Sequence, residues 1–343
     1  MTNRHKQVEG VGLLFHPLLF DAIGAGRFEF DFVEASADLY LDSARAALID
    51  PGATRLRQVV AGRACVFRGS ALSLGSVPET RSLAPSIETV RRIKRLFDLV
   101  PAAALIEPIG FRDPGRSMRL PYTRAAAAWV AARWRAASDA LEAPIWLRPA
   151  KPSFARAPDE LDPFDYLELV GELAGCEFVV DLSDLASLAA QAEIEAPQAV
   201  DRLARLPIAA AALSGTSEDE WRGLAELCAS SAPRAIVVRR NQFLFPLDAI
   251  AQALTRAREI LRSGAAAAAA RPLPVSARLG EIDVTEVERL RRWQAEWVEG
   301  AADGATPEAA ALMQTFEATR NWRTRVEETY KGQEIRKLIA KGP

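Results

Sequence analysis

The sequence of 343 residues contains only two histidines, His5 and His16, both near the N-terminus. Neither lies near a candidate nucleophile in the predicted layout, so no catalytic Ser–His or Cys–His pair can be assembled. The three cysteines are widely spaced, and no Cys-x-x-Cys pair occurs. This spacing argues against a zinc site and against a disulfide framework. Isolated cysteines of this kind usually pack in the core as small hydrophobic residues.

The sequence also lacks an apolar run long enough to cross a membrane. Its first ten residues, MTNRHKQVEG, are polar and have no apolar core of a secretion signal, so we expect a cytoplasmic protein. The formal net charge is only −2, which provides no bulk attraction for nucleic acid or anionic lipid. With 49% hydrophobic and 26% charged residues, the composition is that of a globular protein.

Eight short apolar runs alternate with longer segments in which apolar residues have helical spacing. Repeated strand–helix alternation predicts a parallel sheet with helical crossovers, and eight such units predict a closed (β/α)8 TIM-type barrel. No Gly-x-Gly-x-x-Gly follows the first run, so an open dinucleotide-binding sheet has little support. The predicted strands cover residues 10–15, 28–36, 64–70, 103–110, 143–150, 177–183, 208–215 and 234–240.

Three segments follow one another along the chain. The barrel is predicted to span residues 10–265, and an Ala- and Pro-containing linker covers residues 266–280. Residues 281–343 are predicted to form a helical extension with two amphipathic helices, the second of which begins with Thr306 as N-cap. The aromatic side chains of this extension, Trp293 and Trp297 among them, either pack against the barrel or form an arm that binds a partner.

Charged residues gather at the C-terminal ends of the predicted strands, which in a barrel surround the functional site. Carboxylates that lie close together can perform acid–base chemistry because each shifts the pKa of the other. Arginine is always charged and pairs readily with carboxylates, so a structural ion-pair network is the alternative that we favour. The predicted barrel-mouth cluster comprises Glu34, Asp38, Arg68, Glu107, Arg148, Asp181, Asp184 and Arg239.

The chain carries, in order, the segments GVGLLF, FDFVEASADLYL, FRGSALSLGS, LIEPIGF, RLPYT, WLRPAKPSF, FVVDLSDL and ALSG. Their order and spacing resemble the multinuclear non-heme iron-dependent oxidases, TIM barrels similar to the methanobactin-biosynthesis oxidase. The resemblance covers about residues 10–265, and LSLGS and LPYT are its most specific pieces. It implies an iron cofactor, oxidation of Cys, Asn or Asp in a ribosomal peptide, and a partner protein that helps to present the peptide.

The sequence departs from the family at the positions that the resemblance assigns to iron. Arg68 ends the third strand and Arg148 the fifth, where the family has a histidine and a glutamate. The family's histidines are absent at every motif that aligns. The remaining carboxylates, Glu107 and Asp181 first among them, imply at most a hard cation with oxygen ligands. We therefore expect no metal, with arginine supplying positive charge in its place.

These features lead to one prediction and two alternatives. We predict a degenerate, non-catalytic barrel without a cofactor, which binds a precursor peptide or a partner protein in ribosomal-peptide modification. The first alternative is an active oxidase that holds iron through atypical ligands. The second is a metal-free, anion-binding enzyme that uses Arg68, Arg148, Glu107 and Asp181. None of the three involves nucleic acid or a membrane.

Overall fold

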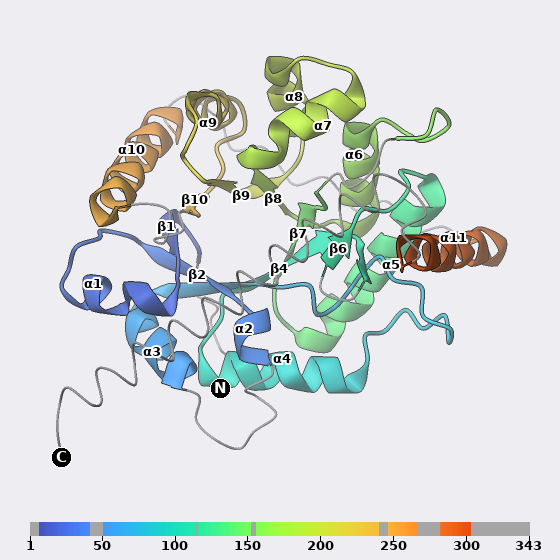
Figure 1. The fold of residues 1–343 in the computed structure, drawn as a ribbon, viewed down its shortest axis with the longest axis horizontal. Helices are drawn as coiled ribbons and strands as arrows, with labels where there is room; N and C mark the ends of the chain where they lie inside the picture. The colour runs from blue at the N-terminus through green and yellow to red at the C-terminus, as the bar shows by residue number, and fades with distance from the viewer. Residues whose placement is uncertain are drawn as a thin grey trace. The chain divides into compact units, whose positions relative to one another are not determined.

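The computed structural model describes residues 7–41, 51–113, 116–151, 156–239, 246–265 and 282–302. Eight parallel strands close into a barrel in the order β1-β10-β9-β8-β7-β4-β3-β2, which confirms the predicted (β/α)8 fold (Figure 1). Each strand lies within one of the eight apolar runs, as expected where helices and core bury both faces. The barrel strands are β1 (Gly10–Leu14), β2 (Phe32–Ser36), β3 (Ala64–Arg68), β4 (Ala104–Ile109), β7 (Ile145–Pro149), β8 (Phe178–Asp181), β9 (Ile208–Leu213) and β10 (Ala235–Val238).

Helices surround this ring of strands (Figure 1). Several begin where the sequence supplies a capping side chain: Ser86, Thr123, Asp162 and Ser217 each accept a hydrogen bond from a backbone N–H of the first turn. The helices are α1 (Phe20–Gly24), α2 (Asp38–Leu41), α3 (Pro51–Val60), α4 (Ile87–Leu99), α5 (Arg124–Leu141), α6 (Pro163–Ala174), α7 (Leu185–Ala192), α8 (Ala196–Leu203), α9 (Glu218–Ser231), α10 (Leu247–Ala265) and α11 (Val284–Ala302), with short 3-10 helices η1 (Pro17–Leu19) and η3 (Leu182–Asp184).

One element was not anticipated from the sequence. The segment between β4 and α5 contains a small antiparallel hairpin, β5 (Phe111–Asp113) and β6 (Arg116–Met118), outside the barrel. It lies in the connection that follows the C-terminal end of β4, so it belongs to the same end of the barrel as the predicted mouth cluster.

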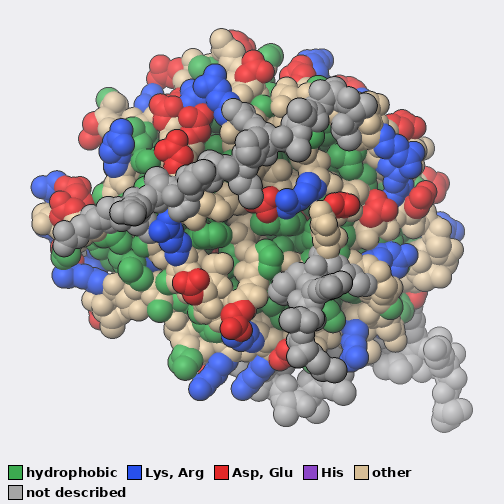
Figure 2. Space-filling model, turned by 180° about the vertical axis from the view of Figure 1, so that it is seen from behind, with side chains coloured by type: hydrophobic (Ala, Val, Ile, Leu, Met, Phe, Trp, Pro, Cys, Tyr) green, Lys and Arg blue, Asp and Glu red, His purple; other side chains and the backbone are tan. Residues whose placement is uncertain are grey.

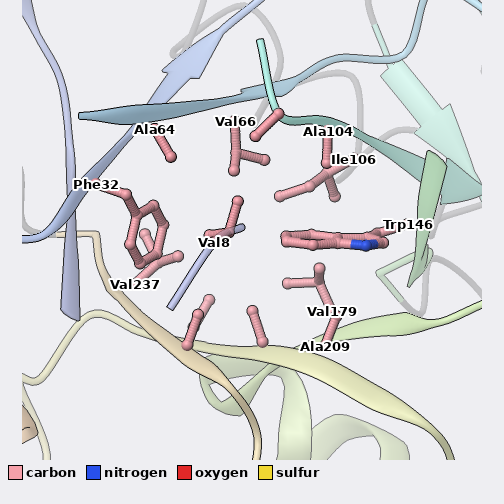
Figure 3. Packing of buried hydrophobic residues seen from close by; sticks show 14 residues of the cluster. Val8, Phe32, Ala64, Val66, Ala104, Ile106, Trp146, Val179, Ala209 and Val237 are labelled. Atoms are coloured by element: carbon pink, nitrogen blue, oxygen red, sulfur yellow. The ribbon is translucent and has the colours of Figure 1, made fainter. Parts of the chain in front are cut away.

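The barrel interior is filled by two large rings and many small residues. Phe32 and Trp146 point toward the barrel axis from β2 and β7 (Figure 3). Alanines of β9, including Ala210 and Ala212, contribute little volume to the same core. Gly12 of β1 lies under the Phe32 ring, where a Cβ would approach a ring carbon to 2.4 Å. Large rings opposite small residues fill the interior without a pore.

The chain divides into two compact units, Met1–Glu288 and Arg289–Pro343, so the boundary falls within α11. This helix coincides with the first of the two amphipathic helices expected in the extension. The predicted linker at residues 266–280 and the predicted helix that begins at Thr306 lie outside the described residues. None of the helices in the described parts of the chain combines the length and the apolar character that crossing a bilayer requires.

Candidate functional site at the barrel mouth

Five charged residues lie at the C-terminal ends of barrel strands with their side chains on the inward face. Side chains alternate between the two faces of a strand, so a residue two positions after an inward-facing one also faces inward. The inward-facing residues that set this pattern are Phe32, Val66, Trp146, Val179 and Val237 (Figure 3). Two positions further along the same strands come Glu34, Arg68, Arg148, Asp181 and, just beyond the end of β10, Arg239.

Arg239 connects the two inward-facing carboxylates. Its Nε donates to Oε1 of Glu34 at 2.9 Å, and its Nη2 donates to Oε2 of Glu34 at 2.8 Å. Its Nη1 donates to Oδ2 of Asp181. The Glu34 side chain has no exposed surface, and that of Arg239 is 7% exposed. The paired, two-point geometry is the strongest arrangement that a guanidinium and a carboxylate can form.

Arg68 and Arg148 are attached to this centre more loosely. Arg68 Nε lies 3.4 Å from Oε1 of Glu34, and Arg148 Nη1 lies 3.9 Å from Oδ2 of Asp181. Their side chains are 30% and 20% exposed, so solvent reaches both. The predicted cluster therefore contains a tight centre of three residues with two further arginines beside it.

The shifts in the pKa values of the charged residues at the mouth follow from this arrangement. Burial alone would raise the pKa of Glu34, but Arg239, Arg68 and Arg148 together lower it below its ordinary value. Asp181 behaves in the same way, because burial opposes ionisation while Arg239 and the Ser183 hydroxyl favour it. Burial and the neighbouring guanidinium groups of Arg239 and Arg68 lower the pKa of Arg148 to about 10. Both carboxylates are thus ionised at neutral pH, whereas burial and two neighbouring guanidinium groups disfavour the charged form of Arg148.

Two acidic residues of the predicted cluster lie at its edge. Asp184 ends η3, just after Asp181, and burial followed by the charge of Asp181 raises its pKa. Asp38 begins α2 and is close enough to Arg68 to favour the charged guanidinium. Neither is part of the centre formed by Arg239 with Glu34 and Asp181.

Glu107 is placed differently from the other predicted residues. It follows Ile106, which points into the barrel (Figure 3), so its own side chain lies on the opposite face of β4. There its Oε1 accepts a hydrogen bond from the backbone N–H of Leu72 at 3.2 Å. Glu107 is completely buried and attaches the loop after β3 to the strand beside it.

The LSLGS segment, residues 72–76, is that loop, and it is held at several points. Arg133 of α5 donates to the carbonyl of Leu72, and the Trp129 indole donates to the carbonyl of Ser76. Gly75 donates to the carbonyl of Gly110 at 2.7 Å. The backbone of this segment, which carries much of the resemblance, is thus held in place at the rim of the mouth.

The LPYT segment, residues 120–123, has a similar anchoring role. Arg119, just before it, is fully buried, pairs with Glu160 at 2.8 Å and stacks under the Tyr122 ring. The Tyr122 backbone N–H donates to the same Glu160 carboxylate. These contacts join the start of α5 to the segment that precedes α6.

The side chains at the mouth that could bind a metal do not fit a multinuclear iron centre, because such a centre needs imidazole and carboxylate ligands. The oxygens of Glu34 and Asp181 already accept hydrogen bonds from Arg239. His16 caps η1 instead, where its Nδ1 accepts from the Leu18 N–H, and His5 lies outside the described residues. Within those residues no group of three or more His, Cys, Asp and Glu side chains is arranged to hold a metal ion.

Acidic and basic side chains are interspersed on the face of the molecule shown in Figure 2. The coloured part of that surface displays no extended region of a single charge. This agrees with the small net charge and gives no sign of a nucleic-acid surface on that face.

Comparison with solved structures finds other barrels at low identity. L-ribulose 3-epimerase is 14% identical with a TM-score of 0.47, covering 77% of this chain and 100% of that one. The 3-keto-D-glucoside 4-epimerase YcjR of E. coli is 14% identical with a TM-score of 0.46, covering 74% and 100%. D-psicose 3-epimerase of Clostridium cellulolyticum H10 is 11% identical with a TM-score of 0.44, covering 84% and 98%. At such identities the likeness says nothing about substrate or reaction.

No curated protein matches the chain. The family described as the RiPP precursor modification enzymes MbnB/TglH/ChrH, which act on ribosomally made peptides, matches residues 10–262. That range begins with β1 and ends in α10, so it comprises the complete barrel. The match confirms the resemblance found in the order of the sequence segments. The chain belongs to the RiPP precursor modification enzyme family MbnB/TglH/ChrH.

Proposed function

We propose that this chain is a non-catalytic member of its family, a cytoplasmic barrel that binds a precursor peptide or a partner protein without an iron cofactor. The observation that supports this proposal is the bonding of Arg239. This one guanidinium engages both inward-facing carboxylates at the end of the barrel where the site of a TIM barrel lies.

An iron centre at this position would have to displace Arg239 from both carboxylates. Glu34 is fully buried, so losing its partner before gaining a metal would leave an uncompensated charge in the protein interior. The two arginines beside it would also repel a cation. The mouth is therefore suited to a ligand that accepts hydrogen bonds from arginine, and a peptide carries such groups along its whole length.

The absence of an iron centre can be tested by metal analysis. The protein is loaded anaerobically with ferrous iron and desalted, and iron is then measured by mass spectrometry. We expect no stoichiometric iron, in the native protein or in the Asp181→Ala variant. Several irons per chain, with visible absorbance that Asp181→Ala abolishes, would contradict the proposal and favour an iron-dependent enzyme. Asp219→Ala, which removes an exposed carboxylate from α9, is the matched control.

Peptide binding requires a separate experiment. Short peptides encoded beside the gene are labelled, and their fluorescence anisotropy is measured during titration with the full-length protein. We expect saturable binding, and no change in peptide mass after incubation with iron and oxygen. A mass change in the peptide would contradict the non-catalytic proposal, and the absence of binding by every such peptide would contradict the peptide-binding proposal.

A further inference from the structure

The mouth contains more arginine than its carboxylates satisfy. Arg239 uses its Nε, Nη1 and Nη2 on Glu34 and Asp181, and the acceptor atoms it occupies are those nearest to the other two arginines. Within the described residues Arg68 and Arg148 donate no hydrogen bond and make only ion pairs, at 3.4 and 3.9 Å. The Nε of Arg148 is buried without a hydrogen-bond partner.

A buried N–H donor without an acceptor is costly, and native proteins rarely leave one in place. Arg148 could have been satisfied by a closer approach to Asp181, but Arg239 holds Oδ2 of that carboxylate at short range. The Arg148 side chain nevertheless retains 20% exposure, and its buried atom without a partner is Nε, so an acceptor from solution reaches the Nη end of the guanidinium. The geometry therefore leaves an arginine fork that is supported by protein on one side and open on the other.

The charges of the centre define what would occupy this position. Arg68, Arg148 and Arg239 carry three positive charges against the two negative charges of Glu34 and Asp181, which leaves one positive charge. Asp38, Asp184 and Lys151, whose charges also act on this cluster, bring the mouth as a whole to neutrality, so the single positive charge belongs to the five residues of the centre. Burial first, and then the guanidinium groups of Arg239 and Arg68, oppose the positive charge of Arg148, and a carboxylate beside it would offset part of that cost.

We propose that Arg148, assisted by Arg68, binds a carboxylate of the peptide at the barrel mouth. A carboxylate carries the single negative charge that balances the centre, and its two oxygens match the planar fork of arginine. A phosphate dianion would bring one negative charge too many. This assignment rests on the proposed peptide-binding function, because the peptide supplies the carboxylate.

Small probes test the site without knowledge of the peptide. The full-length protein is labelled with 15N-arginine, and the Nε–H resonances are followed during titration at constant ionic strength. N-acetylalanine represents a C-terminal carboxylate, N-acetylaspartic acid amide represents an acidic side chain, and N-acetylalanine amide is the uncharged control. Arg148→Lys identifies the Arg148 resonance and preserves its charge but removes the fork.

We expect one of the two carboxylates to shift the Arg148 resonance saturably, while the amide leaves it unchanged. Affinity, followed by thermal shift, should fall about tenfold or more in Arg148→Gln, and also in Arg148→Lys, because charge-assisted hydrogen bonds are lost. Arg222→Gln, an exposed arginine of α9, should bind like the native protein. The more effective probe identifies whether the peptide's end or an acidic side chain is recognised.

The assignment is overturned if neither carboxylate shifts the Arg148 resonance, if Arg148→Gln binds as well as the native protein, or if inorganic phosphate binds more tightly than both carboxylates. These results are distinct from failure of the proposed function. Iron in the purified protein would refute the non-catalytic role even if the carboxylate site exists. Conversely, an iron-free protein that binds its peptide but ignores both probes would refute only the carboxylate site.

Discussion

Arg239 donates hydrogen bonds to two carboxylates that have little or no contact with water. Replacing it with methionine keeps much of the volume but leaves Glu34 charged and buried without its main partner. We expect Arg239→Met to lower the free energy of unfolding by about 3–5 kcal/mol, as is typical when one side of a buried pair is removed. Urea unfolding at neutral pH measures this loss.

A matched control and a double variant test the cause of that loss. Arg222→Met removes an arginine whose ion pair with Asp219 is exposed, and it should cost no more than about 1 kcal/mol. Adding Glu34→Gln to Arg239→Met should recover part of the stability because the buried charge disappears. If the double variant is no more stable than Arg239→Met alone, the two residues are not energetically coupled.

The lowered pKa values of Glu34 and Asp181 also predict a pH dependence. A carboxylate whose folded pKa is depressed stabilises the protein above its ordinary pKa, and this stability is lost as the pH falls through the folded pKa. The free energy of unfolding should therefore fall as the pH drops below about 4.5, the ordinary value for Glu. In the Glu34→Gln, Arg239→Met double variant this fall should be shallower, by up to about 1.4 kcal/mol per pH unit. An unchanged slope would contradict the assigned shift of Glu34.

At the scale of elements, the loop after β3 depends on a close backbone contact. A Cβ on Gly75 would lie 2.5 Å from the backbone of Gly110, which cannot rotate away as a side chain can. We expect Gly75→Ala to lower the free energy of unfolding by about 1–3 kcal/mol, the usual cost of overpacking. Gly24→Ala in α1 is the control, because no atom lies within 4 Å of the added Cβ. Equal stability of the two variants in thermal unfolding would show that the loop is not held in this way.

The strands and the hairpin differ in how far they could be predicted from the sequence. All eight barrel strands were predictable, because each is an apolar run between segments of helical spacing. The face to which Glu107 points was not predictable, since β4 is buried on both sides and its sequence, ALIEPI, is apolar on both sides of Glu107 and shows no alternation. The β5–β6 hairpin was not predicted, although the sequence between residues 111 and 118 contains Asp-Pro-Gly, a turn signal.

The pairing within the mouth could not be predicted for a related reason. Strand ends indicate which side chains converge, and Arg239, Glu34 and Asp181 were all among the predicted residues. Which arginine takes which carboxylate depends on strand order and register across the barrel. Glu34 and Arg239 are 205 residues apart in the sequence, and their contact arises only because β1, between β2 and β10, closes the ring.

At the scale of the whole molecule, the barrel is complete before the C-terminal extension begins. All strand pairs and α10 lie within residues 10–265, so a chain that ends at residue 265 should fold with cooperative urea unfolding. It loses the burial of Val287 and should be less stable by about 1.5–3 kcal/mol. As a control, Glu288→Ala in the full chain removes the ion pair between Glu288 and Arg81 while the extension stays in place, so the contribution of that pair can be measured separately. A truncated protein without a cooperative transition would make the extension part of the folding core.

The pairing of β1 with β10 has a consequence for synthesis on the ribosome. Gly10 pairs with Ala235, so the nascent chain must grow by more than two hundred residues before β1 gains its second neighbour. At typical translation rates this interval lasts roughly 10–45 s, during which one edge of β1 is available to other chains. Gly10 and Gly12 make β1 a poor template for such pairing. Gly12, which admits the Phe32 ring to the finished core, and Gly10, which lies against Asp31, thus also limit aggregation while the protein is being made.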